Sequence, residues 1–180
     1  MEPTEDSGTS IDAPSDSMIV MTDAPGDGPT AGTCSTGGFV CTGTAVAITC
    51  NGSCWVKCQT TVPVAGQNVA AVACAGWGGS LAPIRNTADQ ACVAQMLFPS
   101  QAHWIGLEQD STASLVTAGW TWNGNGVAIS YDNWGNGQPN DANGTEPDHA
   151  EQCAFMNTAG DWHDTSCTDN GLYRFSCRKN

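Results

Sequence analysis

The chain has 180 residues, enough for one domain with a sizeable core, and its 18 acidic residues against 5 Lys and Arg give a net charge of −13. This charge argues against nucleic acid and against insertion into anionic membranes, because both partners are recognised by basic patches. Ten cysteines, an even number, indicate disulfides and therefore an oxidising, extracellular compartment.

Residues 1–33 differ from the rest of the chain in composition, with seven acidic residues, no Lys, Arg or His, and many Pro, Ser, Thr and Gly. Such a segment buries too little apolar surface to offset its chain entropy, so we expect a disordered acidic linker. Charged linkers stay extended, which is typical of a tether on a bacterial-type surface protein. The sequence contains no apolar stretch of membrane-spanning length and no apolar signal core, so an export signal is expected to be missing from this chain.

Residues 34–58 hold five cysteines among small and β-favouring residues, which predicts short strands or hairpins joined by disulfides. We assign residues 34–53 to a Cys-rich β extension and residues 54–180 to the main domain. Two C-x3-C spacings occur here but no pair of C-x2-C spacings, which argues against zinc bound by cysteines.

Two helices are predicted next along the chain. Residues 64–79 are rich in Ala and end in glycines, as a short helix with a glycine stop would. A second helix is predicted within residues 86–97, because Asn86 is a good N-cap and Asp89 follows three residues later. The predicted apolar face of this helix consists of Ala88, Cys92, Val93, Met96 and Leu97.

Beyond the second helix the helical pattern disappears, and Trp, Gly, Asn and Asp dominate. The candidate strands are residues 104–107, 120–122, 153–156 and 172–177. Two helices followed by short strands and long loops predict an α+β fold.

Several motifs follow one another in an order that is specific in combination: "GGSLAPI", "WIGL", "GWTWNG", "YDNWGNGQPN", "EQC", "WHDTSC" and "FSC". In this order they resemble the C-type lectin-like domain, over about residues 54–180. The resemblance implies a C-type lectin-like fold: two helices, short antiparallel sheets and a long loop region, stapled by disulfides. It places five tryptophans in the core: Trp104, Trp120, Trp122, Trp134 and Trp162.

The resemblance also implies two disulfides, Cys74–Cys177 and Cys153–Cys167, each stabilising the fold by about 2 to 4 kcal/mol. The sequence does not indicate how the other six cysteines pair. They are Cys34, Cys41, Cys50, Cys54, Cys58 and Cys92. Cys92 is expected to pair with a cysteine between residues 50 and 58, or else to be a buried free thiol.

In the calcium-dependent members of that family, a Ca²⁺ ion holds the sugar. Its ligands come from a tripeptide with a central proline, an acid two residues before the third core cysteine, and an Asn-Asp pair after a tryptophan. The matching residues, implied as calcium ligands and as carbohydrate-binding residues, are Gln138, Asn140, Glu151 and Asp164. Their oxygens suit Ca²⁺. The resemblance also implies a cis Gln138–Pro139 bond when metal is bound. The tripeptide "QPN" mixes the mannose-type and galactose-type patterns and does not indicate one sugar.

The candidate site departs from the family pattern at His163, which stands where the family has Asn, and imidazole is a poor ligand for Ca²⁺. Either His163 is a hydrogen-bonding residue outside the site, or it is a possible ligand. Asp141 or Asp148, in the long loop, is a possible replacement for the missing ligand. The same acidic loop is also consistent with an ordinary solvated surface loop.

The distribution of charge favours a metal, since residues 86–173 contain eleven Asp and Glu and no Lys or Arg. The predicted function is therefore Ca²⁺-dependent binding of glycans or glycoconjugates by a secreted or surface-tethered lectin. The alternative is calcium-independent binding of a protein or another surface by the same fold. An enzyme is not expected: a zinc hydrolase built on His149 and His163 would lack the H-E-x-x-H motif, and the sequence has no nucleophile elbow.

Overall fold

The computed structural model describes eight segments of the chain: residues 33–41, 43–58, 64, 66–97, 100–123, 125–144, 150–171 and 173–180. All of them belong to the compact unit Thr33–Asn180. The predicted linker, residues 1–33, lies outside the described residues apart from Thr33, and its disorder stays a prediction.

The described residues form an α+β fold, which confirms the predicted class. Its strands are β1 (Ala45–Cys50), β2 (Ser53–Cys58), β3 (Ser80–Leu81), β4 (His103–Gln109), β5 (Trp120–Trp122), β6 (Cys153–Met156), β7 (Trp162–Thr165) and β8 (Arg174–Lys179). Its helices are α1 (Gln67–Gly76), α2 (Thr87–Met96) and the short α3 (Asp141–Gly144). None of these helices is long and apolar enough to cross a membrane.

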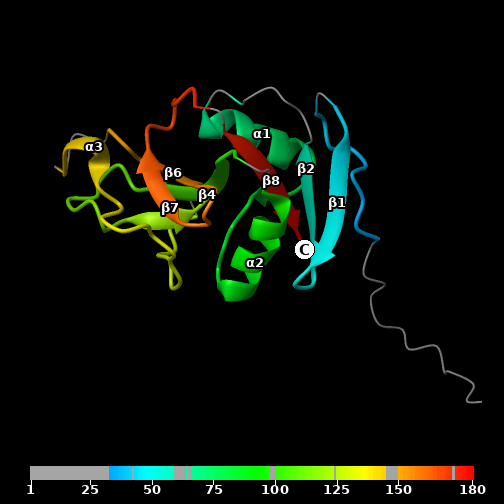
Figure 1. Cartoon of the computed structure of the whole chain (residues 1–180), viewed down its shortest axis with the longest axis horizontal. Coiled ribbons are helices and arrows are strands. Elements are labelled where there is room, and N and C mark those ends of the chain that lie inside the picture. Colours follow the sequence, from blue (N-terminus) through cyan, green and yellow to red (C-terminus); the bar gives the residue numbers. More distant parts are fainter. Residues whose placement is uncertain are drawn as a thin grey trace, which may run out of the picture. The chain divides into compact units, whose positions relative to one another are not determined.

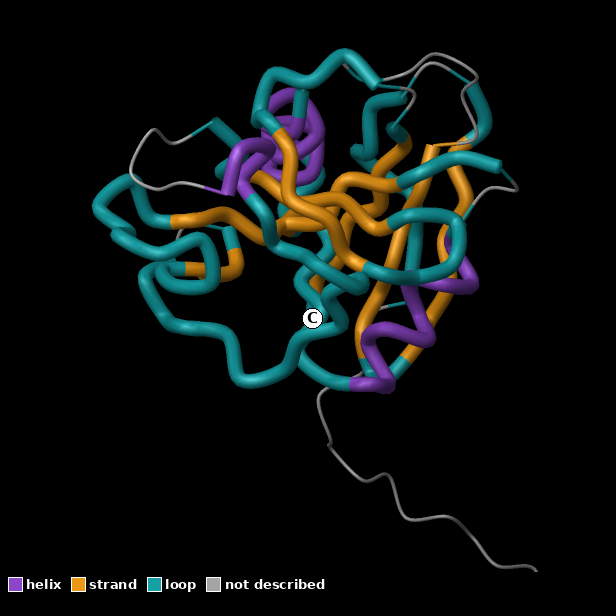
Figure 2. The backbone as a smooth tube through the Cα atoms, turned by 60° about the vertical axis from the view of Figure 1, so that its left-hand side comes forward, coloured by secondary structure: helices purple, strands orange, loops and turns teal. Residues whose placement is uncertain are grey.

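The strands follow the order β1-β2-β8-β4-β6-β7, with β3 added to β8 and β5 added to β4. All neighbouring pairs are antiparallel except β4 and β8, which run parallel, with His103 opposite Arg174. Figure 1 shows β1 and β2 at one side of the domain and β6, β7 and α3 at the other, with β8 between them. In Figure 2 the strands gather in the middle, and the loops extend outward from them.

Helix α2 begins as the sequence predicts, because the Asn86 Oδ1 atom accepts a hydrogen bond of 2.9 Å from the Asp89 backbone N–H. The predicted apolar face is wrong at one position: Ala88 is exposed, whereas the neighbouring Asp89 is fully buried. The cause is an ion pair of 2.7 Å between the Asp89 Oδ2 and Arg178 Nη1 atoms. Asp89 thus joins α2 to β8, and its burial follows from this pairing rather than from helical periodicity.

The ten cysteines form five disulfides, and none is free. The pairs are Cys34–Cys54, Cys41–Cys58, Cys50–Cys92, Cys74–Cys177 and Cys153–Cys167. The last two are the pairs implied by the family resemblance, and Cys50 is the partner of Cys92. The first four of these disulfides each have at least one cysteine in β1, β2, β8, α1 or α2. We call these five elements the stapled region.

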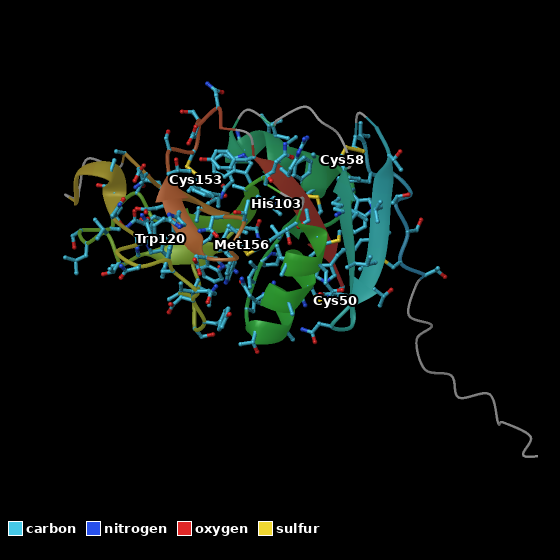
Figure 3. The ribbon with its side chains drawn as sticks, viewed as in Figure 1. Cys50, Cys58, His103, Trp120, Cys153 and Met156 are labelled. Carbon is cyan, nitrogen blue, oxygen red and sulfur yellow. A yellow bond between two sulfur atoms is a disulfide. The ribbon has the colours of Figure 1, made fainter. Side chains whose placement is uncertain are left out.

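Residues 110–152 form a second part, which we call the loop region; it contains no cysteine. Tryptophans fill the core next to it. Trp162 packs edge-on against Trp122, Tyr131 and Trp134, with ring centroids 5.4, 5.7 and 5.9 Å away. Trp104, Trp120, Trp122 and Trp162 are buried, and Trp134 is partly buried, so packing is the role of these rings. Figure 3 shows Trp120 and Met156 among these core side chains.

The predicted strands differ from the observed ones in several places. Strand β4 extends over His103–Gln109 instead of residues 104–107, β8 begins at Arg174, two residues later than predicted, and β3 and β7 were not predicted. Strand β7 has the sequence "WHDT", and its His and Asp residues are not typical of strands. This segment is a strand because it pairs with β6. Strand β1 lies within the predicted extension 34–53 and β2 begins at its last residue; the boundary itself stays a prediction.

Candidate functional site

The predicted ligand residues lie on three elements that meet at the edge of the loop region. Gln138 and Asn140 precede α3, Glu151 lies two residues before β6, and Asp164 belongs to β7. Strand β6 pairs with β7, with Ala154 opposite Asp164, so the sheet carries Glu151 and Asp164 to the same edge. The Gln138–Pro139 peptide bond is cis.

The Asp164 carboxylate holds the tripeptide against β7. It accepts hydrogen bonds from the backbone N–H of Asn140, at 3.0 and 2.9 Å to its two oxygens, and from the backbone N–H of Asp141, at 2.7 Å. In return, the Asp164 backbone N–H donates to the Gln138 Oε1 atom at 3.3 Å. The Asp164 side chain is buried, so these bonds fix where the tripeptide lies.

Asp141 and Glu151 are joined in the same way. The Glu151 backbone N–H donates to the Asp141 Oδ1 atom at 3.0 Å, and the Ala142 backbone N–H donates to the Glu151 Oε2 atom at 2.6 Å. The Ala142 N–H also lies 3.2 Å from the Asn140 Oδ1 atom. Asp141, which was predicted only as a possible ligand, is 1% exposed and lies inside the cluster.

The cluster is electrostatically unbalanced. Burial raises the pKa of Glu151, and the negative charges of Asp164, Asp141 and Asp169 raise it further, against a lowering hydrogen bond from Ala142. No Lys or Arg occurs in residues 86–173 to offset these charges. The raised pKa means that the ionised form of Glu151 is disfavoured here, as expected where carboxylates crowd without a cation.

His163 lies apart from the cluster. Its Nε2 atom lies 3.0 Å from Asn157 Nδ2, and its ring stacks on Phe155 with centroids 5.4 Å apart. Neighbouring residues of a strand point to opposite faces, so His163 faces away from the Asp164 carboxylate. Asp148, another possible ligand, and His149 lie outside the described residues.

The oxygen atoms of this cluster fit a hard cation such as Ca²⁺, which takes ligands from carboxylates and amide carbonyls. Hydrogen bonds through backbone N–H groups link three carboxylates and two side-chain amides, which belong to Gln138, Asn140, Asp141, Glu151 and Asp164. A carboxylate oxygen that accepts one hydrogen bond still has a second lone pair. Within the described segments, however, no three His, Cys, Asp or Glu side chains already stand in a metal-binding arrangement.

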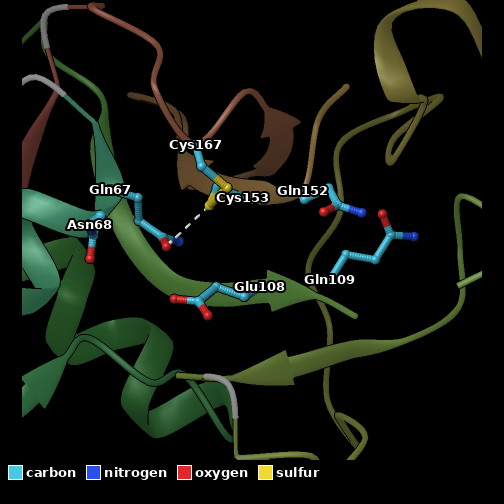
Figure 4. Close-up of a pocket in the computed structure, with 7 residues that line it drawn as sticks. All are labelled: Gln67, Asn68, Glu108, Gln109, Gln152, Cys153 and Cys167. Atoms are coloured by element: carbon cyan, nitrogen blue, oxygen red, sulfur yellow. Dashed lines mark hydrogen bonds between the residues drawn. A yellow bond between two sulfur atoms is a disulfide. The ribbon is translucent and has the colours of Figure 1, made fainter. Parts of the chain in front are cut away.

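A cavity of about 290 Å³, lined by none of the cluster residues, was not predicted from the sequence (Figure 4). Its lining consists of Gln67, Asn68, Glu108, Gln109, Gln152 and the Cys153–Cys167 disulfide. The Gln67 Nε2 atom donates to the backbone oxygens of Ile105 and Leu107, at 2.8 and 3.0 Å. Its Oε1 atom is 3.2 Å from the Cys153 sulfur, a contact without a hydrogen because that sulfur is disulfide-bonded.

Gln109, on the other side of the cavity, organises the start of the loop region. Its Nε2 atom donates to the backbone oxygens of Leu115, Val116 and Ala118, at 3.1, 3.3 and 3.0 Å. Burial raises the pKa of the neighbouring Glu108 carboxyl. No sequence pattern distinguishes Gln67 or Gln109, because the role of a buried glutamine depends on the backbone carbonyl groups to which it donates in the folded chain.

With this geometry in view, comparison with known proteins identifies the family. Residues 66–179 match the family described as "Lectin C-type domain". That match covers more than half of the chain, so the chain belongs to the C-type lectin domain family. The family is one of binding domains and not of enzymes.

The curated relatives are animal proteins, so the expected bacterial-type origin is not supported. A perlucin-like protein of Mytilus galloprovincialis is 33% identical over 109 residues, which cover 57% of this chain and 64% of that protein. The mannose-binding protein of Gallus gallus is 28% identical over 100 residues, covering 56% of this chain and 35% of that protein. The match thus spans less than two thirds of the length of these relatives.

Solved structures share the fold. The mouse scavenger receptor C-type lectin carbohydrate-recognition domain has a TM-score of 0.60 and 24% identity, covering 74% of this chain and 95% of that chain. A calcium-independent type II antifreeze protein has a TM-score of 0.54 and 21% identity, with coverage of 74% and 95%. At these identities the likeness shows the fold alone. Because one of these proteins is calcium-independent, calcium binding does not follow from the fold.

Proposed function

We propose that this chain is a calcium-dependent carbohydrate-binding domain that acts outside the cell, where its disulfides are stable. One observation carries the proposal: a single hydrogen-bond network contains the carboxylates of Asp141, Glu151 and Asp164 and the tripeptide Gln138–Asn140, and residues 86–173 contain no Lys or Arg. Burial and, to a smaller extent, neighbouring carboxylates raise the pKa of Glu151, and a cation that joined this group would favour the ionised carboxylate.

The ion would be held by Gln138, Asn140, Glu151 and Asp164, with Asp141 in place of the ligand that His163 does not supply. A bound Ca²⁺ offers open positions that two neighbouring sugar hydroxyls can occupy. The amide groups of Gln138 and Asn140 and the carboxylates supply hydrogen bonds to the same hydroxyls. The partner is therefore a glycan or glycoconjugate, recognised through an adjacent pair of hydroxyl groups.

The first test is a calorimetric Ca²⁺ titration of the chelator-treated protein. Binding in the millimolar range or tighter is expected, and Glu151→Gln or Asn140→Ala should abolish it, because each change removes an oxygen ligand or its charge. Disulfides and fold should be unaffected, as near-ultraviolet circular dichroism would show. Asp132→Asn removes an exposed carboxylate outside the cluster and Asp23→Asn removes one in the predicted linker, and both should bind as the parent does.

A glycan array with and without chelator completes the test. Binding that needs Ca²⁺ and disappears with chelator supports the proposal. If Asp132→Asn and Glu151→Gln lose Ca²⁺ equally, the site has been misplaced, and if the protein does not bind Ca²⁺ up to several millimolar, the proposal is wrong.

A second function is favoured by a different observation: the Asp164 carboxylate is already bonded to the backbone N–H groups of Asn140 and Asp141. These bonds hold the tripeptide without a metal, as a calcium-independent binding surface requires. On this reading, ligand binding should persist in chelator. Asp164→Asn should then weaken it by loosening the tripeptide, and Glu151→Gln should change it little.

A further inference from the structure

Six asparagines of this chain are each followed by a glycine: Asn51, Asn123, Asn125, Asn136, Asn143 and Asn170. In such a pair the backbone nitrogen of the glycine can attack the side-chain carbonyl carbon of the asparagine, because glycine has no Cβ atom to hinder the approach. The structure does not describe Gly124 or the side chain of Asn143, so the pairs that begin at Asn51, Asn125, Asn136 and Asn170 can be compared.

The asparagine side chain is held in two of these four pairs. The Asn51 Nδ2 atom donates a hydrogen bond to the Asp89 Oδ1 atom at 2.8 Å. The Asn125 Oδ1 atom accepts one from the backbone N–H of Val127 at 2.9 Å. Each of these bonds must break before the side chain can turn toward the nitrogen of the following glycine.

In a third pair it is the attacking nitrogen that is held. The backbone N–H of Gly171, which follows Asn170, donates to the Asp169 Oδ1 atom at 2.9 Å. This nitrogen is therefore engaged with a carboxylate and directed away from the asparagine side chain. We call the pairs at Asn51, Asn125 and Asn170 the held pairs.

The pair at Asn136 has neither restraint. Asn136 is exposed, and its side chain has no hydrogen-bond partner among the described residues. The backbone N–H of Gly137 makes no hydrogen bond to any described residue either. A Cβ atom on Gly137 would have no atom within 4 Å, so the space around this glycine is open. Both reacting groups of the pair are thus accessible in the folded protein.

The turn that contains Asn136 lies between two points that are fixed to β7. Before it, the Gly135 backbone N–H donates to the Trp162 backbone oxygen at 2.9 Å. The turn is closed by the Gln138 backbone N–H, which donates to the Gly135 backbone oxygen at 3.0 Å. After it, the Asp164 carboxylate holds the tripeptide. Any lengthening of the backbone at Asn136 must therefore be absorbed between two fixed points.

We propose that Asn136 is a site of spontaneous deamidation and that its conversion to isoaspartate loosens the tripeptide. The Gly137 nitrogen forms a bond to the Asn136 side-chain carbonyl carbon, and the bond from that carbon to Nδ2 breaks. The side-chain nitrogen leaves as ammonia, together with the proton that the Gly137 nitrogen loses. Water then opens the resulting succinimide ring at either carbonyl, which gives aspartate or isoaspartate. No oxidant or reductant is required.

Isoaspartate differs from aspartate in that the backbone runs through the former side chain and gains a methylene group. Because the turn is fixed at Gly135 and at the tripeptide, this extra length should strain the hydrogen bonds that Asp164 makes to Asn140 and Asp141. The expected change concerns these hydrogen bonds alone, so it does not depend on calcium binding.

The test incubates the folded protein at mildly alkaline pH and follows each asparagine by mass spectrometry. Chymotrypsin cuts after tryptophans, which places Asn125, Asn136 and Asn170 on different peptides, and fragment ions locate each new carboxyl group. Asn136 should convert about five- to tenfold faster than the held pairs, because a hydrogen bond must break first in each of those. In the isoaspartate form, hydrogen exchange should become faster at the backbone amides of Asn140 and Asp141.

The matched control is the same protein, reduced and unfolded in urea, in which all four pairs should convert at similar rates because the hydrogen bonds are lost. Asp169→Ala removes the acceptor of the Gly171 N–H, so it should speed the conversion of Asn170 and leave that of Asn136 unchanged. Asn136→Gln keeps an amide but closes the ring far more slowly. After the same incubation, the backbone amide of Asn140 in this variant should exchange as it did before.

Three results would overturn the proposal. The first is a conversion of Asn136 in the folded protein that is no faster than that of the held pairs. The second is an isoaspartate form in which Asn140 and Asp141 exchange at unchanged rates. The third is faster exchange of these amides in incubated Asn136→Gln, since the loosening would then come from another residue.

Discussion

The stapled region is crossed by four disulfides, whereas the loop region contains no cysteine and is held by amide side chains, buried carboxylates and packed tryptophans. The stapled region contains four of the five Lys and Arg residues, one in β2 and three in β8, and the loop region contains most of the acidic cluster. Covalent links act mainly on the unfolded chain, while polar contacts act on the folded loops themselves. Changes in the first region should therefore alter global stability, and changes in the second should alter local order and binding.

The largest effect is expected from the disulfide with the longest span. Replacing Cys74 and Cys177 together by Ala opens a link across 103 residues, which should lower the free energy of unfolding by about 4 to 5 kcal/mol. The matched pair Cys153→Ala and Cys167→Ala opens a link across 14 residues and should cost about 3 kcal/mol. Urea unfolding of the two double variants gives the comparison. An equal or larger loss for the shorter link would contradict it.

The next effect concerns His103, which is fully buried where β4 meets β8. Burial and, to a smaller extent, the charges of Lys57 and Arg174 lower the pKa of His103, against hydrogen bonds with the backbone of Gln101 and Met96, and together they bring it from 6.5 to about 4. The imidazole of His103 binds a proton more readily in the unfolded chain than in the folded one. The contribution of neutral His103 to the free energy of unfolding is therefore fully present above pH 6.5 and is lost as the pH falls toward 4.

The expected loss is about 3 kcal/mol, at 1.36 kcal/mol for each pH unit between the two pKa values. Urea unfolding at several pH values should show a steeper fall for the parent than for His103→Asn, which does not titrate. The slope is the readout, so a general loss of stability in the variant does not obscure it. Parallel slopes would mean that His103 is not the group responsible.

The smallest effect belongs to the loop region. Gln109→Ala removes the donor that reaches the carbonyls of Leu115, Val116 and Ala118, and should cost about 1 to 3 kcal/mol. Hydrogen exchange should become faster at the amides of Ala113 and Ala118, which close the turns of this segment. Protection in β1 and β2 should stay unchanged. A loss of protection spread evenly over both regions would erase the distinction between them.

Much of the fold could be predicted from the sequence because its signals are local. The N-cap at Asn86, the glycines after α1 and the order of the tryptophan and cysteine motifs each act over a few residues. Cys34–Cys54 and Cys41–Cys58 could not be predicted, because each pair depends on where residues 34–41 fold back onto β2. Strand β7 was missed for a similar reason, since only its register with β6 makes it a strand.

The candidate site divides in the same way. Gln138, Asn140, Glu151 and Asp164 were expected from motifs, and hydrogen bonds link them through one network. Asp141 was expected only as one of two possible replacement ligands, because its place in the network depends on the turn after the tripeptide, where its φ is 49°. The ion pair between Asp89 and Arg178 was not expected, since the two residues are far apart in sequence and meet only in the folded chain.

The separation of the Lys and Arg residues of β8 from the acidic cluster gives the domain a permanent dipole moment. In Figure 1, α3 and the C-terminal residue next to Lys179 lie far apart across the view. Charges act over roughly 8 Å at physiological salt, so a charged partner that comes close meets Lys and Arg side chains at β8 and carboxylates around α3. The orientation of the domain therefore decides whether such a partner is attracted or repelled at short range.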